Sequence, residues 1–162
     1  MRKTVLAPIA ILFAVALGTP AWSEGAPPPP PAPPYGAPIT LDQAMKAASA
    51  AEAEAKKRNM KMVIAIVEPT GELVYFRRMD GAQYASIKIA QEKAISAAIF
   101  RRSTKDFFDR LAKGDLSPLS LHGAVASAGG IPIVVNGHII GAIGTSGGAD
   151  DPVSQAGVDA LK

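Results

Sequence analysis

The residues best suited to bind an anion form a glycine-rich segment, Gly-Thr-Ser-Gly-Gly, at positions 144–148. Two runs of β-branched and apolar residues, 131–135 and 138–143, predict strands before it, and Asn136-Gly137 between them suits a type I′ hairpin turn. Glycines allow positive φ angles and close approach to another group, and a helix that starts after them presents N–H groups and a positive dipole end. We therefore expect a site for a carboxylate or another anion at Thr145, Ser146, Gly147 and Gly148.

Two aspartates follow this segment and complicate the prediction. Asp150 or Asp151 can cap a helix that has Pro152 near its start. Their negative charges also compete for the N–H groups that would hold an outside anion. Two interpretations therefore stay open: an anion-binding cradle, or glycines that serve only a tight turn and the close packing of a helix on a sheet.

The chain has two histidines, His122 and His138, and each is a candidate metal ligand. His122 lies in an irregular stretch beside a glycine, where its ring could face a cleft or belong to the plain surface. His138 follows the Asn-Gly turn, so we expect it at the exposed end of the hairpin, where it could be an ordinary surface residue. Two histidines cannot supply the three imidazoles of a His₃ zinc site within one chain. Other candidate ligands or contact groups, each of which could equally belong to the core, are Met62, Met79 and Tyr84.

Two cations are candidate partners for an anion. Lys93 and Arg101 are eight residues apart in a stretch with a helical pattern, which is close to two turns. One face of that helix could therefore present both side chains to the same anionic group.

The glycine-rich segment also spells the Gly-x-Ser-x-Gly motif of a serine hydrolase, between a predicted strand and a predicted helix. In that class the catalytic histidine follows the serine in the chain, whereas both histidines here precede Ser146. Few residues remain after the motif to complete such a fold. We therefore exclude a serine hydrolase.

The N-terminus has the pattern of a secretory signal peptide. Arg2 and Lys3 form a short basic region, residues 5–17 are almost all apolar, and Ala21-Trp22-Ser23 fits the small-x-small cleavage pattern. The apolar run is shorter than the roughly 20 residues that a membrane span needs. We therefore expect residues 1–23 to be removed, leaving a periplasmic or secreted protein without a membrane-inserted segment.

Composition narrows the class of the mature protein. The chain has 17 lysines and arginines against 14 acidic residues, and loss of the two basic residues of the signal leaves a net charge of about +1. That balance gives no electrostatic reason to expect a nucleic acid partner. The absence of cysteine excludes disulfides, thiolate nucleophiles and Cys-ligated metals.

The rest of the chain predicts one α+β domain behind a proline-rich tether. Residues 24–39 hold eight of the 14 prolines and are expected to be extended. Adjacent predicted strands are joined by short turns, which favours an antiparallel sheet packed by helices. In the helix over 84–100, alanines and Ile95 and Ile99 predict a wide apolar face. The predicted helices cover 41–58, 84–100, 104–111 and the residues from 152, and the predicted strands cover 62–67, 73–79, 131–135 and 138–143, with an irregular stretch over 114–128 that has room for one short strand.

Several stretches together resemble one known family. Arg78-Met79-Asp80-Gly81-Ala82, Lys93-Ala94 and Phe100-Arg101, followed by the runs 129–133 and 141–147, are similar to the haem-binding GlcG/HbpS family (DUF336), which is related to the C-terminal domain of PduO-type proteins. The resemblance covers most of residues 40–162. It implies a profilin-like or PAS-like antiparallel sheet of about five strands flanked by helices, and assembly into a homo-oligomer.

The resemblance also implies a function: binding of a small ligand, haem above all, for scavenging, storage or sensing. Haem is a flat apolar dianion that needs an axial ligand and a place for its propionates. We expect it between the alanine-rich helix and the glycine hairpin, without catalysis. The alternative is an enzyme or accessory protein acting on a small organic acid or carbonyl metabolite, with Lys93, Asp80 and segment 145–148 as its polar groups. A third hypothesis is a purely structural oligomer.

Overall fold

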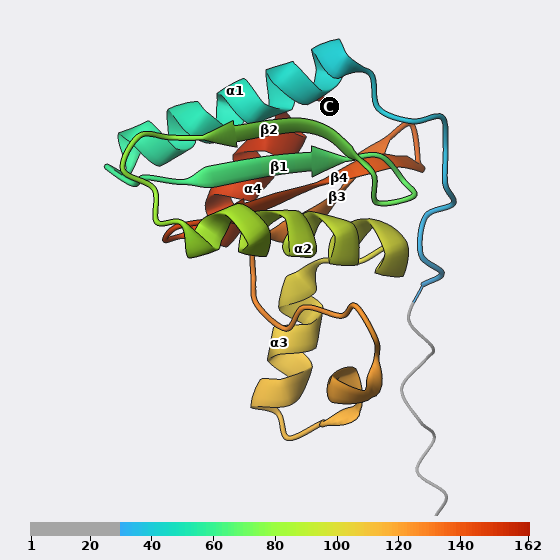
Figure 1. Cartoon of the computed structure of the whole chain (residues 1–162). Helices are drawn as coiled ribbons and strands as arrows, with labels where there is room; N and C mark the ends of the chain where they lie inside the picture. Colours follow the sequence, from blue (N-terminus) through green and yellow to red (C-terminus); the bar gives the residue numbers. More distant parts are fainter. Residues whose placement is uncertain (1–29) are drawn as a thin grey trace, which may run out of the picture. The chain divides into compact units, whose positions relative to one another are not determined.

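The computed structural model describes residues 30–162, so the expected signal segment 1–23 and the start of the expected tether, 24–29, lie outside the described residues. The described chain forms α-helices on both sides of one antiparallel sheet (Figure 1). In chain order its elements are α1 (Leu41–Lys57), β1 (Val63–Val67), β2 (Leu73–Arg78), α2 (Ala85–Phe100), α3 (Thr104–Ala112), the 3₁₀ helix η1 (Ser117–Ser120), β3 (Gly130–Val135), β4 (His138–Ser146) and α4 (Asp150–Asp159).

The sheet has the strand order β2-β1-β4-β3, and every neighbouring pair is antiparallel. The first and last hairpins along the chain therefore meet at β1 and β4 in the middle of the sheet. Pro132 lies in β3, which is an edge strand, where a residue without an N–H group leaves no ladder bond unmade. Asn136 and Gly137 join β3 to β4 with φ angles of 50° and 77°, as a type I′ turn requires.

Both faces of the central strands are covered by helices, and Figure 1 shows α1 and α4 on one face and α2 on the other. All five residues of β1 are buried. Ile64 and Ile66 belong to the cluster with α1 and α4, whereas Val63, Ala65 and Val67 belong to the cluster with α2. This continuous apolar run with alternating partners is what a strand covered on both faces requires.

Helix α2 lies against two glycines that are cross-strand partners, Gly130 of β3 and Gly144 of β4. A Cβ at Gly144 would be 2.1 Å from the Ala90 carbonyl oxygen, and a Cβ at Gly130 would be 2.4 Å from the Lys93 carbonyl oxygen. The helix turns this side toward the sheet with alanines that are fully buried. Small residues on both elements therefore let the helix backbone approach the sheet backbone.

The end of the proline-rich segment packs on the domain. Gly36 donates its N–H to the Ile139 carbonyl at 2.9 Å, Ile139 donates to the Pro34 carbonyl at 2.8 Å, and Tyr35 forms a parallel bridge with Ile139. Ile39 is buried against the cluster of α1 and α4. The Tyr35 hydroxyl also lies within hydrogen-bond distance of carbonyl oxygens at the end of α2. The described part of the expected tether is thus joined to the start of β4 through one isolated bridge and the flanking hydrogen bonds.

The structure confirms the predicted α+β class with an antiparallel sheet, and it has four strands where about five were expected. Two local predictions need correction. Residues 144–146 belong to β4 rather than to a loop, because their backbone continues to pair with β1. The stretch 114–128 contains the 3₁₀ helix η1 and no strand. Among residues 30–162, no helix combines the length and the apolar character needed to cross a bilayer.

The contact between α2 and β4 gives a first prediction. Gly144→Ala places a methyl group against helix backbone that no side-chain rotation can relieve, so the free energy of unfolding should fall by about 3 kcal/mol. Urea unfolding followed by circular dichroism measures this change. Gly137→Asn is the control, because no atom lies within 4 Å of its Cβ position and asparagine tolerates positive φ. Equal stability of the two variants would contradict the proposed close contact.

Candidate functional site

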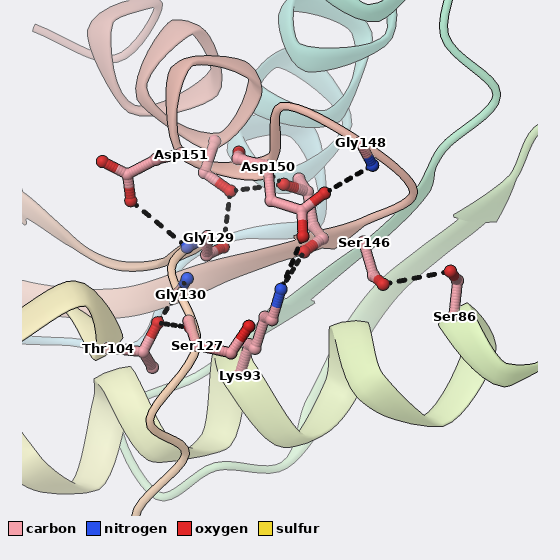
Figure 2. A network of polar contacts seen from close by, with 12 residues as sticks. Ser86, Lys93, Thr104, Ser127, Gly129, Gly130, Ser146, Gly148, Asp150 and Asp151 are labelled. Atoms are coloured by element: carbon pink, nitrogen blue, oxygen red, sulfur yellow. Dashed lines mark hydrogen bonds and ion pairs between the residues drawn. The ribbon is translucent and has the colours of Figure 1, made fainter. Parts of the chain in front are cut away.

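One N–H group of the predicted anion cradle, that of Gly148, is bonded to a carboxylate of the chain itself, and so is the N–H of Gly129, whose carbonyl accepts from the Thr145 N–H. Gly148 donates its N–H to Asp150 Oδ1 at 2.9 Å, and Gly129 donates to Asp151 Oδ1 at 3.2 Å (Figure 2). Both aspartates stand in the first turn of α4, whose N-cap is Ala149, without a side-chain capping bond. The aspartates therefore compete for the N–H groups as the sequence suggested, and they bond residues outside the helix rather than cap it.

Lys93 points into the protein from the middle of α2, and its side chain is only 1% exposed. Its Nζ donates to Asp150 Oδ2 at 2.6 Å and to the Thr145 carbonyl at 3.3 Å (Figure 2). The ammonium thus has a negative partner within the chain. A buried cation needs such a partner, because removing it from water without one is costly.

Thr145 and Ser146 complete this buried cluster. The Thr145 hydroxyl donates to the Asp150 carbonyl at 2.7 Å and lies 2.9 Å from the Ser154 hydroxyl, and Ser154 donates to the Gly129 carbonyl at 2.7 Å. Ser146 donates to the Ser86 hydroxyl at 3.0 Å (Figure 2). No buried side-chain polar atom in residues 30–162 lacks a hydrogen-bond partner.

We call the set Lys93, Gly129, Thr145, Gly148, Asp150 and Ser154 the Lys93 network. It joins α2, the start of β3, the end of β4 and α4, and its polar groups bond one another. The chemistry that it supports is therefore structural: it fixes these four elements around a tight turn at Gly147, whose φ angle is 144°.

Solvent exposure differs among the three candidate contact groups, Met62, Met79 and Tyr84. Met62 is fully buried, and Met79 is 8% exposed, with its Sδ accepting the Met62 N–H at 3.4 Å. Both sulfur atoms thus belong to the packed core. Tyr84 precedes α2 and is 78% exposed, and the Arg78 guanidinium carbon lies 5.0 Å from the centre of its ring. Asp80 is exposed in the turn between Arg78 and Tyr84.

His138 is exposed at the first position of β4, directly after the hairpin turn. Its Nδ1 lies 3.0 Å from the Asn136 carbonyl oxygen. With the proton on Nδ1, this bond leaves Nε2 available to a metal.

His122 is exposed in the turn that follows η1. This turn packs on α2, since Gly123 lies against Ile99 and Val125 donates its N–H to the Ser96 hydroxyl at 3.0 Å. The segment before it is held by Asp115, which accepts from Ser117 and pairs with Arg110. Hydrogen bonds from Ser117, with a further one from Arg110, lower the pKa of Asp115 to about 2.

Lys93 and Arg101 do not share a face as predicted. Arg101 caps the C-terminus of α2 in the left-handed conformation, with φ 54°, and is exposed with its guanidinium carbon 5.5 Å from the centre of the Tyr35 ring. Lys93, in contrast, is buried and belongs to the Lys93 network. The left-handed cap breaks the helical periodicity on which the prediction depended.

Sequence reasoning missed the exposed apolar side chains on the outer side of α2. Ile95 is 37% exposed and Ile99 is 40% exposed, although both were assigned to one wide apolar face with the alanines. The alanines face the sheet and the isoleucines face outward. The sequence did contain a signal for this arrangement, because the predicted apolar face of the helix was too wide to be covered by the sheet alone. Among residues 30–162, no three His, Cys, Asp or Glu side chains are grouped closely enough to hold a metal.

The Lys93 network gives a second prediction. Asp150→Asn keeps the shape of the side chain but leaves the buried Lys93 ammonium without its negative partner, so the free energy of unfolding should fall by about 3 kcal/mol. Asp109→Asn is the matched control, because Asp109 pairs with Lys105 at the same 2.6 Å on the exposed surface. Thermal unfolding should show a large loss for the first variant and little for the second; equal losses would show that burial does not matter here.

Comparison with known proteins is consistent across sequence and structure. A family model described as "Haem degrading protein HbpS-like" matches residues 39–161. The GlcG protein of Escherichia coli K12 is 38% identical over 110 residues, which cover 67% of this chain and 82% of GlcG. An uncharacterised 15.0 kDa protein of Citrobacter freundii is 37% identical over 118 residues, covering 68% of this chain and 80% of that protein.

Solved structures share the fold. The Klebsiella pneumoniae protein ORFY aligns with a TM-score of 0.72 at 31% identity, covering 78% of this chain and 92% of ORFY. A double mutant of Streptomyces reticuli HbpS aligns with a TM-score of 0.70 at 29% identity, covering 84% of this chain and 99% of HbpS. The PduOC complex with heme aligns with a TM-score of 0.70 at 25% identity, covering 77% of this chain and 96% of PduOC. The family model and these relatives agree on one assignment: this chain is a member of the HbpS-like family.

Proposed function

We propose that the mature protein is a haem-binding protein of the periplasm or the extracellular space. Two findings support the proposal. The chain belongs to the HbpS-like family, and one solved relative, PduOC, is a complex with heme. The observation in this structure that carries the proposal is the pair of exposed imidazoles, at His122 and His138, on a domain whose Gly148 and Gly129 N–H groups are already bonded to its own carboxylates.

The donor set fits haem. Imidazole is a common axial ligand of haem iron, exposed aliphatic side chains suit the porphyrin faces, and a guanidinium suits a propionate. Residues 30–162 offer each of these at the surface, in the two histidines, in Ile95 and Ile99, and in Arg101. Bound haem would supply an iron centre for ligand binding or redox chemistry, and the chain would hold it by ligation, apolar contact and charge.

The competing hypothesis, an enzyme for a small organic acid or carbonyl compound, loses most of its polar groups to buried contacts within the chain, although Asp80 stays exposed. Lys93 is buried and bonded to Asp150, and the Thr145 and Ser146 hydroxyls bond other buried groups. A thermal-shift screen of small organic acids beside hemin compares the two hypotheses, since only a ligand of the native state raises the melting temperature. We expect a shift with hemin and none with the acids.

Haem binding is tested by titrating hemin into the purified mature protein. We expect a saturable shift of the Soret band that reports ligation of the iron. Iron-free protoporphyrin IX is the control, because it offers the same apolar faces and propionates without a metal to ligate, and it should bind more weakly. A titration with hemin that never saturates would contradict the proposal. Because the family is described as haem degrading, the loaded protein is also followed for loss of the Soret band after addition of ascorbate.

We propose export on the basis of the N-terminal residues alone, since the basic residues Arg2 and Lys3, the apolar run 5–17 and the Ala-Trp-Ser sequence form a signal-peptide pattern. When the full chain is expressed in a bacterium, the protein recovered from the periplasmic fraction should begin at Glu24. Intact mass spectrometry measures this start. A full-length mass, or recovery in the cytoplasm alone, would contradict export.

We further propose that the protein forms a homo-oligomer, as the family resemblance implies. Several large apolar side chains are exposed in the single chain, among them Leu41, Met45 and Leu73. Light scattering coupled to size-exclusion chromatography measures the mass in solution, and a mass equal to that of one chain would contradict this proposal.

A further inference from the structure

Three segments meet at the outer side of the C-terminal half of α2. The turn after β1 reaches it at Gly71, where a Cβ would lie 3.3 Å from Ile95 Cγ2. The turn after η1 reaches it at Gly123, where a Cβ would lie 3.6 Å from Ile99 Cδ1. Both turns approach the helix at a glycine, which has no side chain to cover the isoleucines. Ile95 and Ile99 therefore keep more than a third of their area exposed.

The third segment is the end of the proline-rich stretch. Tyr35 donates its hydroxyl to the Ile99 carbonyl at 3.1 Å or to the Ala98 carbonyl at 3.0 Å, and the ring is 45% exposed. Leu121, at the start of the turn that carries Gly123, is 39% exposed. We define the Ile99 surface as Tyr35, Ile95 and Ile99.

A histidine and an arginine are chain neighbours of residues at this surface. His122 directly precedes Gly123, in a turn closed by the Ala124 N–H bonding the Leu121 carbonyl at 3.1 Å. Arg101 follows Ile99 by two residues and stands over Tyr35. Within residues 30–162, Arg101 takes part in no salt bridge.

His138 has different surroundings. It follows the polar turn Asn136-Gly137, its Cβ faces Gly36, and the next residue, Ile139, is fully buried. Its imidazole is thus available. Tyr35 bridges the next residue, Ile139, but Ile95 and Ile99 are approached by the turns that carry Gly71 and Gly123 rather than by the hairpin turn. A porphyrin needs both an axial ligand and apolar area to cover its faces.

We infer that haem binds on the Ile99 surface, with His122 as the axial ligand of the iron and Arg101 as the partner of a propionate. The inference rests on the proposed haem-binding function and assigns its site. It differs from the sequence-based expectation, which placed the ligand between α2 and the glycine hairpin, because the Lys93 network fills that space.

The test compares hemin titrations of the wild-type mature protein with two matched variants, His122→Ala and His138→Ala. Both residues are exposed, so both variants should fold and keep the wild-type melting temperature. We expect the dissociation constant to rise about tenfold or more for His122→Ala, with a changed Soret position, and to stay within about twofold for His138→Ala. Free imidazole added to His122→Ala should restore the wild-type Soret position, which a purely structural role would not do.

Arg101 is tested by Arg101→Gln, with Arg101→Lys as the control that keeps the charge in the same left-handed position. The first should weaken hemin binding by about two- to fivefold and the second should not. Ile99→Asp tests the apolar contact and should weaken hemin binding without changing the mass in solution.

The outcomes separate the site from the function. If the wild-type protein does not bind hemin, the proposed function fails. If it binds and His122→Ala binds equally well, or if His138→Ala is the variant that loses binding, the assigned site is wrong. If Ile99→Asp changes only the oligomeric state, the Ile99 surface is a contact between copies of this chain and the inference is overturned.

Discussion

Helix α2 lies so close to the sheet that the Ala90 carbonyl oxygen would be 2.1 Å from a Cβ at Gly144. Backbone contact of this kind needs glycine on the strand and alanine on the helix, and the chain places Gly130 opposite Gly144 beneath α2. The close approach also determines where Lys93 goes. Its side chain is buried between helix and sheet, so its ammonium needs a partner within the chain, and Asp150 at the start of α4 supplies it. The Lys93 network is a consequence of that packing.

The network in turn decides which parts of the molecule can bind a ligand. Glycine N–H groups at a helix start ordinarily suit an anion from outside, but here Asp150 and Asp151 supply the anionic oxygens from within the chain. The buried Lys93 ammonium and the glycine loop therefore stabilise the fold. The residues that we propose for recognition lie on the outer side of α2, where Ile95 and Ile99 face outward and the turn that carries His122 approaches Ile99.

Most secondary structure was predictable from the sequence because the local signals agree. Thr40 and Gln43 form a capping box at α1, Asn136-Gly137 has the φ angles of its turn, and the buried run of β1 reads as a strand. The end of β4 was misread because glycines inside a strand resemble a loop when the helix packed on them is not known. The expected cradle likewise could not be resolved in advance, since no local pattern says that the Asp150 side chain folds back to Gly148.

The sequence by itself determined the α+β class, the family resemblance and the shortlist of candidate ligands, because these depend on residue types, spacing and short-range periodicity. Only the tertiary structure decided how those candidates are grouped. Lys93 and Asp150 are 57 residues apart and form one buried pair, whereas Lys93 and Arg101 are eight apart and face different environments. The turn that carries His122 approaches Ile99 at Gly123 and is held by the Val125 N–H bond to the Ser96 hydroxyl. Contacts between distant segments depend on how helices pack on the sheet, and that packing is not encoded in any single stretch of the chain.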